Sequence, residues 1–196
     1  MRANHVLIDW ENVQPASLEL LDREDVRVHV FTGALQKDIQ LDKAAALQPM
    51  GTRAQYIRMA RSGRNALDFH IAFYIGQLSV TDKTAFFHII SKDKDFDPLI
   101  EHLKSKKILC ARSTTVEEMP FVKVASAKTP SARMTLVLAG FPAEPTKRPA
   151  TLKTLSSAIN SRFGKSLAEE EVAAVIAALV DGGHISIEGQ KVTHHG

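Results

Sequence analysis

Residues 84–100 read TAFFHIISKDKDFDPLI, and this stretch decides the fold. Ala85 to Ile90 form an apolar run of strand length, and Pro98 to Lys106 have the pattern of an amphipathic helix. Between them lies an acidic turn that contains Asp93, Asp95 and Asp97. A strand that leads through a short turn into a helix is typical of α/β domains with a parallel sheet.

The same strand-then-helix order repeats on both sides of this stretch. The other predicted strands are His5 to Ile8, Val26 to Phe31, Ala54 to Ile57 and Lys107 to Ala111, and the other predicted helices are Pro15 to Leu21, Ile39 to Leu47 and Ala66 to Leu78. Parallel strands with few polar residues need helices on both faces. The sequence therefore predicts a Rossmann-like three-layer α/β domain over residues 1–128.

A change of pattern after residue 128 predicts a second, smaller domain. A helix at Ala132 to Gly140 and the segment FPAEPTKRPA (141–150) are typical of a linker region, which we place at 129–150. Beyond it, Leu152 to Phe163 and a segment that ends at Val180 have helical periodicity, the second opened by a predicted capping box from Ser166 to Glu169. Ile185, Ile187 and Val192 then alternate as in a hairpin, so residues 151–196 predict a winged-helix-like domain.

Acidic residues lie where a parallel sheet binds ligands, directly after strands. Asp9 ends the first strand, Asp93 follows the strand of the opening stretch, and Asp68 lies on the apolar side of the helix NALDFHIAFYIGQL. Carboxylates that converge repel each other unless a hard cation lies between them, and Mg²⁺ and Mn²⁺ prefer such oxygen ligands. A bound ion of this kind can activate water and stabilise charge on a phosphoryl oxygen, so the pattern indicates a metal-dependent hydrolase.

These acidic segments also resemble a known family. IDWENV with Asp9 and Asn12, LDFHIA with Asp68, and ISKDKDFDPLI with Asp93 and Asp95 resemble the PIN-like NYN-domain nucleases, specifically the LabA-like group. The resemblance covers about residues 4–125 and implies a nuclease in which Asp9, Asp68 and Asp93 hold Mg²⁺ or Mn²⁺. By the same resemblance Asn12 matches a polar position beside the site. Asp95 is a candidate catalytic, second-shell or second-metal group, and Ser91 and Asp97 are candidate positions beside the ligands. Two positions depart from the family: Lys92 stands where members often have glycine, and Asp97 stands where they often have an apolar residue. The tail is similar to the winged-helix or OST-HTH-like domains attached to some bacterial members.

Asp97 also has a purely structural explanation, since Asp before Pro98 is a common way to begin a helix. Asn12 could likewise cap the helix predicted from Pro15, with Glu11 as its solvent-facing neighbour.

Basic residues near the acids predict nucleic acid as the partner. Three of them, Arg58, Arg61 and Arg64, precede the helix that carries Asp68, and Lys92 and Lys94 bracket Asp93. We expect these cations to contact phosphates. A solvated loop explains them equally well, and the net charge of +3 permits a polyanion without requiring one. We expect RNA as the substrate, leave DNA and a homodimer open, and expect no membrane partner.

The chain has features of a cytoplasmic protein. Its single cysteine, Cys110, cannot form a disulfide within the chain, which favours a reducing compartment. The first apolar run, Val6 to Ile8, is too short for the core of a signal peptide, and no run approaches the roughly twenty apolar residues of a membrane span.

Two other functions compete with a metal-dependent ribonuclease. DWENV and DKDFD loosely match the motifs of aspartyl-phosphate phosphatases of the HAD type, but Glu11 replaces their second Asp and no cap domain is visible. A non-catalytic RNA-binding or assembly module is the third reading, against which the retained acids argue. No G-x-G-x-x-G follows the first strand, so dinucleotide binding is disfavoured.

Overall fold

The computed structural model describes residues 2–195, which form two compact units with their boundary between Val122 and Lys123. The first unit contains β1 (Asn4–Asp9), η1 (Leu18–Leu21), β2 (Val26–Thr32), α1 (Leu41–Leu47), η2 (Gln48–Arg53), β3 (Ala54–Arg58), α2 (Ala66–Thr81), β4 (Phe86–Ile90), α3 (Phe96–Ser105), β5 (Leu109–Ser113) and the first residues of α4 (Pro120–Ser126). The second unit contains α5 (Pro130–Gly140), η3 (Pro145–Lys147), α6 (Leu152–Arg162), α7 (Glu169–Asp181), β6 (Ile185–Glu188) and β7 (Lys191–His194).

A five-stranded parallel sheet organises the first unit. Its strand order is β3-β2-β1-β4-β5, so the chain moves outward from β1 in one direction and then returns to build the other half from β4. The strand order reverses between β1 and β4, which is where sheets of this kind bind ligands beyond their carboxyl ends. This arrangement confirms the predicted three-layer α/β fold.

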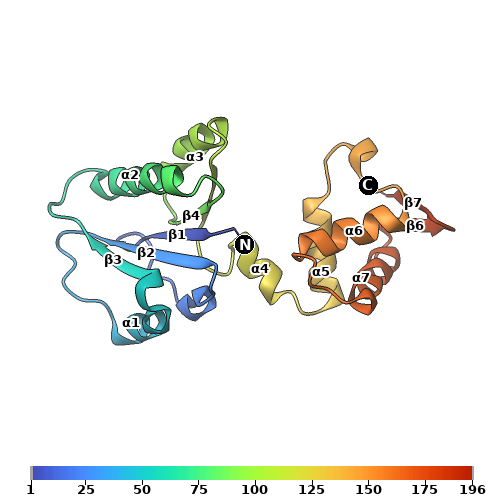
Figure 1. The fold of residues 1–196 in the computed structure, drawn as a ribbon, viewed down its shortest axis with the longest axis horizontal. Helices are drawn as coiled ribbons and strands as arrows, with labels where there is room; N and C mark the ends of the chain where they lie inside the picture. The colour runs from blue at the N-terminus through green and yellow to red at the C-terminus, as the bar shows by residue number, and fades with distance from the viewer. Residues whose placement is uncertain (1, 196) are drawn as a thin grey trace. The chain divides into compact units, whose positions relative to one another are not determined.

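Helices cover both faces of this sheet, as Figure 1 shows with α2 and α3 on one side and α1 on the other. Each face has its own apolar core. On the α2 and α3 side the core includes Leu7, Ile71 and Ile100, and on the other side it includes Val6 and Leu47. Successive residues of β1 thus point into different cores, which explains why this strand is apolar at every position from Val6 to Ile8.

In the first unit, the segment around η1 and the start of α3 differ from the sequence predictions. The first predicted helix is only the short 3₁₀ turn η1 at Leu18–Leu21, preceded by Pro15 in an irregular segment. Helix α3 begins at Phe96, so the prediction that Asp97 caps it was wrong: Asp95 occupies the N-cap position. Pro98 is tolerated inside the first turn because the backbone N–H groups there have no partner within the helix.

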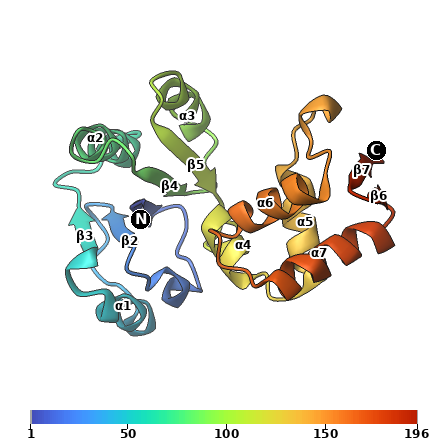
Figure 2. The same ribbon diagram turned by 45° about the vertical axis from the view of Figure 1, so that its right-hand side comes forward.

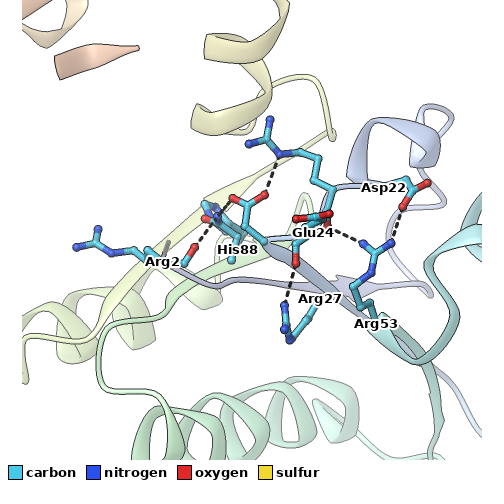
Figure 3. A network of polar contacts seen from close by, with 9 residues as sticks. Arg2, Asp22, Glu24, Arg27, Arg53 and His88 are labelled. Atoms are coloured by element: carbon cyan, nitrogen blue, oxygen red, sulfur yellow. Dashed lines mark hydrogen bonds and ion pairs between the residues drawn. The ribbon is translucent and has the colours of Figure 1, made fainter. Parts of the chain in front are cut away.

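Polar contacts tie the amino-terminal ends of the strands together, at the edge opposite the predicted site (Figure 3). Asn4 donates to the Asp25 carboxylate and accepts from His88, while Arg53 binds both Asp22 and the carbonyl of Arg23. These contacts satisfy backbone and side-chain groups where the strands enter the sheet.

Three buried histidines lie within the sheet. His5 Nδ1 and His29 Nε2 are 3.0 Å apart, and His88 Nε2 is 3.0 Å from Asn4 Oδ1. Within residues 2–195 the Nδ1 atoms of His29 and His88 have no hydrogen-bond partner. Burial lowers the pKa of each of these two imidazoles to about 4, so both are neutral at physiological pH.

The second unit is a separate helical domain that ends in a hairpin. Its core gathers residues from α5, α6, α7 and both strands, including Val137, Leu155, Val175 and Val192. Figure 2 shows α5, α6 and α7 grouped together, and α5 makes extensive contacts with α7. The helix expected at 132–140, within the helix-and-linker region 129–150, corresponds to α5, which packs into this core.

Helix α7 begins later than predicted. The predicted capping box from Ser166 to Glu169 was wrong: the helix starts at Glu169, and the Glu171 carboxylate accepts a hydrogen bond from the backbone N–H of Ala168. The Ser166 hydroxyl instead donates to the carbonyl of Phe163, which closes the turn after α6. No described helix combines the length and the apolar character that crossing a bilayer requires.

Candidate active site

An acidic pocket lies at the carboxyl ends of β1 and β4, at the point where the strand order reverses. It has a volume of about 260 Å³ and a mostly polar lining. The lining residues come from the β1 end, the β3–α2 loop, the first turn of α2 and the β4–α3 loop: Asp9, Glu11, Asn12, Gly63, Asn65, Ala66, Leu67, Asp68 and Asp93. The structure thus brings together the three acids from distant segments that the sequence assigns to one site.

Asp9 forms the floor of this acidic pocket. It ends β1 and is only 4% exposed, and its two carboxylate oxygens each accept a hydrogen bond. Oδ2 accepts from the Ser91 hydroxyl at 2.9 Å, and Oδ1 accepts from the backbone N–H of Asn12 at 3.2 Å. Burial raises the pKa of Asp9, while these two hydrogen bonds act in the opposite direction. The carboxylate is therefore held in one orientation.

Ser91 and Asn12 connect the two loops that carry Asp9 and Asp93. The fully buried Ser91 hydroxyl donates to Asp9 and accepts from the backbone N–H of Asp93 at 3.1 Å. Asn12 Oδ1 accepts from the backbone N–H of Lys92 at 2.9 Å. These contacts keep Asp9 and Asp93 close, and they give both polar residues a positioning role beside the acids.

Asp68 enters the acidic pocket from the first turn of α2. This helix begins after Asn65, whose backbone has a left-handed conformation with φ of 55°. Leu67 and Ile71 are buried against the sheet, whereas Asp68 is half-buried at the pocket wall. Within the described residues its carboxylate has no hydrogen-bond or ion-pair partner.

The acids of this pocket interact electrostatically. The pKa of Asp68 is raised, and partial burial is the largest cause. The negative charges of four neighbours raise it further, in decreasing order of effect Asp9, Asp93, Asp95 and Glu11. The same effect acts on Asp9, whose pKa is raised, after burial, by Glu11 and Asp93. The mutual repulsion marks a site that a cation would stabilise.

Glu11 belongs to the acidic pocket, although from the sequence it was expected as a solvent-facing neighbour of Asn12 or as the residue in place of a phosphatase's second Asp. Its side chain lies against Gly33, the residue directly after β2: a Cβ at Gly33 would lie 1.7 Å from Glu11 Oε1. Gly33 thus leaves room for the carboxylate. Two signals could have identified Glu11, its spacing two residues after Asp9 and a glycine directly after the neighbouring strand.

Asp95 and Asp97 lie outside the lining of the acidic pocket. Asp95 is exposed at the start of α3, and its backbone N–H donates to Asp93 Oδ1 at 2.9 Å. Both carboxylate oxygens of Asp97 bind Arg112, at 2.9 Å and 3.1 Å, and this hydrogen-bonded ion pair lowers the pKa of Asp97. Arg112 also donates to the carbonyl of Ser91. Asp97 is thus connected to the loop that carries Asp93 through Arg112.

The predicted phosphate-binding cations are all exposed. Arg61 and Arg64 lie in the loop that leads into α2, and Lys92 and Lys94 flank Asp93. These four side chains make no ion pair with any described residue. Arg58 differs, because its guanidinium donates to the carbonyl of Ala34 at 2.8 Å.

The aromatic residues beside the acids are part of the core. Trp10 is 1% exposed and Phe96 is 2% exposed, so neither offers a free ring face to a nucleic-acid base.

The donor set of this pocket suits a hard divalent cation. The acidic side chains that line it offer carboxylate oxygens, which Mg²⁺ and Mn²⁺ prefer. The Asp68 carboxylate has no partner among the described residues, and the negative charges of the other acids raise its pKa. Within residues 2–195 no group of three or more His, Cys, Asp or Glu side chains is arranged as it stands to hold a metal ion. Asp9, Asp68 and Asp93 are therefore candidate ligands by their chemistry and their shared pocket, not by a formed coordination geometry.

A comparison with protein families agrees with this geometry. The family model described as PIN domain matches residues 3–113, which include every acidic residue of the pocket. No curated protein and no solved structure matches the chain.

Proposed function

The chain belongs to the PIN domain family, whose members are in general metal-dependent nucleases, and from this premise we propose that it hydrolyses RNA phosphodiester bonds with Mg²⁺ or Mn²⁺. The observation that carries the proposal is the acidic pocket, where Asp9, Asp68 and Asp93 meet at the reversal of strand order. The NYN-like motifs around these residues support RNA as the substrate.

In this proposal Asp9, Asp68 and Asp93 hold the cation. The bound ion would supply Lewis-acid activation of water and stabilisation of charge on the scissile phosphate. Ser91 keeps the Asp9 carboxylate oriented through its hydrogen bond, and the Asp95 backbone N–H does the same for Asp93. These hydrogen bonds limit how far the two carboxylates can turn.

The exposed cations would bind the RNA backbone. Arg61 and Arg64 lie in the β3–α2 loop, whose Gly63 and Asn65 line the acidic pocket, and Lys92 and Lys94 flank Asp93, so phosphates of a bound RNA would meet positive charge there. These contacts would offset the repulsion between the acids and a polyanion.

We propose that residues 151–196 act as a winged-helix-like module that holds the substrate. Lys153, Arg162 and Lys165 are exposed on or beside α6 and would contact the RNA backbone. Glu169 and Glu170 at the start of α7 oppose insertion of that helix into a nucleic-acid groove. Backbone contact without sequence reading is thus the expected mode, and a protein partner is the alternative.

The residue two positions after Asp9 disfavours the aspartyl-phosphate alternative. Glu11 stands where the phosphatase motif has its second Asp.

Cleavage assays on the full chain test the proposal. Labelled single-stranded RNA, structured RNA and single-stranded DNA are incubated with Mn²⁺, with Mg²⁺ and with EDTA. We expect RNA cleavage that EDTA abolishes, and a loss of more than about 100-fold in Asp9→Asn and Asp93→Asn. Asp42→Asn is the matched control, because Asp42 is an exposed acid on α1 outside the pocket.

Metal binding is measured separately by the shift of the thermal unfolding midpoint with Mn²⁺. Wild type and Asp42→Asn should be stabilised and Asp68→Asn should not. Equal cleavage by wild type and Asp9→Asn would refute the proposed site. Mn²⁺ and RNA binding without any turnover would instead support the non-catalytic alternative.

A further inference from the structure

The outer face of α2 is apolar although it faces solvent. Phe69 is 69% exposed, Phe73 is 64% exposed and Val80 is 74% exposed, and Gly76 lies between them in the sequence. At about 100° per residue these four positions share one side of the helix, opposite Ile71 and Ile75, which are fully buried on the sheet. We call Phe69, Phe73, Gly76 and Val80 the α2 outer face.

A helix that is apolar on both sides is usually covered on both sides. Within the described residues, the ring contact of Phe73 is an edge-on contact with the adjacent Tyr74, at 5.8 Å between centroids. Apart from its chain neighbours and the nearby backbone of α2 itself, no described atom lies within 4 Å of the position that a Cβ of Gly76 would occupy. The face thus has two projecting rings and a hollow where the helix backbone is bare.

We propose that the α2 outer face is a two-fold dimer interface, in which α2 packs antiparallel against α2 of a second copy. This inference goes beyond the nuclease proposal and does not depend on it.

The spacing of the four residues is self-complementary. If the two-fold axis passes midway between Phe69 and Val80, Phe69 of one copy faces Val80 of the other, and Phe73 faces Gly76. Each large ring then meets a smaller residue or the bare backbone, which is the ridge-into-groove arrangement of packed helices. A two-fold interface requires this property, because the same patch must fit itself.

The exposed area is suitable for the centre of such an interface. With about 200 Å² for each phenylalanine side chain, the three side chains expose roughly 400 Å² per copy. A standard interface buries about 800 Å² per partner, with an apolar centre and a polar rim. His70 and Gln77, both exposed on α2, flank the face on one side and would belong to this rim.

The charges at the ends of α2 also favour the antiparallel arrangement. Asp82 follows the negative carboxyl end of the helix, which is the unfavourable end of the helix dipole for a negative charge. In the dimer Asp82 of one copy would lie near the positive amino end of α2 in the other copy, where a negative charge is stabilising.

The dimer would place two acidic pockets on one assembly. Asp68 lies in the first turn of α2, so the two Asp68 residues would be separated by roughly 20 Å along the helix axes, at a rise of 1.5 Å per residue.

Sedimentation equilibrium of the full chain over a range of concentrations tests the proposal. We expect a dimer for the wild type and at least a tenfold higher dissociation constant for Phe73→Glu. Leu41→Glu is the matched control, because Leu41 is 84% exposed on α1 and lies outside the α2 outer face. Circular dichroism checks that each variant is folded.

A charge-pair experiment tests the register. Phe69→Glu and Val80→Lys should each weaken self-association, and an equimolar mixture of the two should recover it, because the introduced carboxylate of one variant would then face the introduced ammonium group of the other across the interface. A monomeric wild type, or a mixture that associates no better than either variant, overturns the proposal. A monomer in which Phe73→Glu weakens RNA binding would assign the face to single-stranded nucleic acid instead.

Discussion

Lowering the pH from 7.5 to 5 is expected to remove about 4 kcal/mol from the free energy of unfolding, through His29 and His88. Burial lowers the pKa of both imidazoles to about 4, against 6.5 for an unperturbed histidine. The unfolded chain therefore binds protons that the folded chain does not, so stability falls as the pH drops below about 6.5 and continues to fall until about 4. At about 1.4 kcal/mol per pKa unit, each histidine contributes roughly 2 kcal/mol over this range.

Other groups modify this loss in known directions. The pKa of His5 is also lowered by burial, so His5 acts in the same direction as the other two histidines. Asp9 and Asp68 act in the opposite direction: their pKa values are raised in the folded state, so protonation favours the folded chain as the pH falls. A loss of about 4 kcal/mol is large against the 5–15 kcal/mol that stabilises a typical domain.

Urea unfolding followed by Trp10 fluorescence measures the effect. Trp10 is the single tryptophan of the chain and is buried in the first unit, so it reports on the unit that contains the histidines. His88→Phe should reduce the pH dependence by about half, while His102→Gln, which changes an exposed histidine on α3, should leave it unchanged. A free energy of unfolding that stays constant within about 1 kcal/mol from pH 7.5 to 5 would refute the reasoning.

Three further predictions concern the acidic pocket. Ser91→Ala should lower the free energy of unfolding by about 1–3 kcal/mol and weaken Mn²⁺ binding, whereas Ser91→Thr, which keeps the hydroxyl, should bind Mn²⁺ as the wild type does. Urea titration measures the stability and thermal shifts measure the Mn²⁺ binding; unchanged Mn²⁺ binding in Ser91→Ala would contradict the positioning role of Ser91. Asp97→Asn should leave Mn²⁺ binding unchanged, because Asp97 pairs with Arg112 outside the pocket; lost binding would show that it is a ligand. Arg64→Ala should weaken RNA binding and lower the salt dependence of log Kd by about one, in fluorescence anisotropy titrations with Asp42→Asn as control; an unchanged salt slope would exclude a phosphate contact.

Local patterns predicted most of the first unit. The five strands lie within a few residues of their expected positions, because β strands with both faces buried must be apolar over their whole length. Helices α1, α2 and α3 also follow from periodicity. Boundaries were less predictable: α3 begins before Pro98 and α7 begins at Glu169, since several capping arrangements compete with similar energies.

Members of the candidate site could be predicted where a residue's position at the end of a strand, or on one side of a helix, determines where its side chain points. Asp9 and Asp93 follow strands that are neighbours in the sheet, so the parallel topology brings them together. Glu11 could not be assigned in this way, because its place in the pocket depends on the space left by Gly33 after a different strand. The pairing of Asp97 with Arg112 likewise depends on β5 lying beside β4.

The sequence by itself determined the class of fold and the acids that end its strands, since both depend on local apolar patterning and on the order of elements along the chain. Only the tertiary structure decided which polar side chains share the pocket and which pair with residues outside it. It also decided that one side of α2 remains uncovered. Those properties depend on distances between residues far apart in the sequence, and such distances arise only when the strands pair and the helices pack.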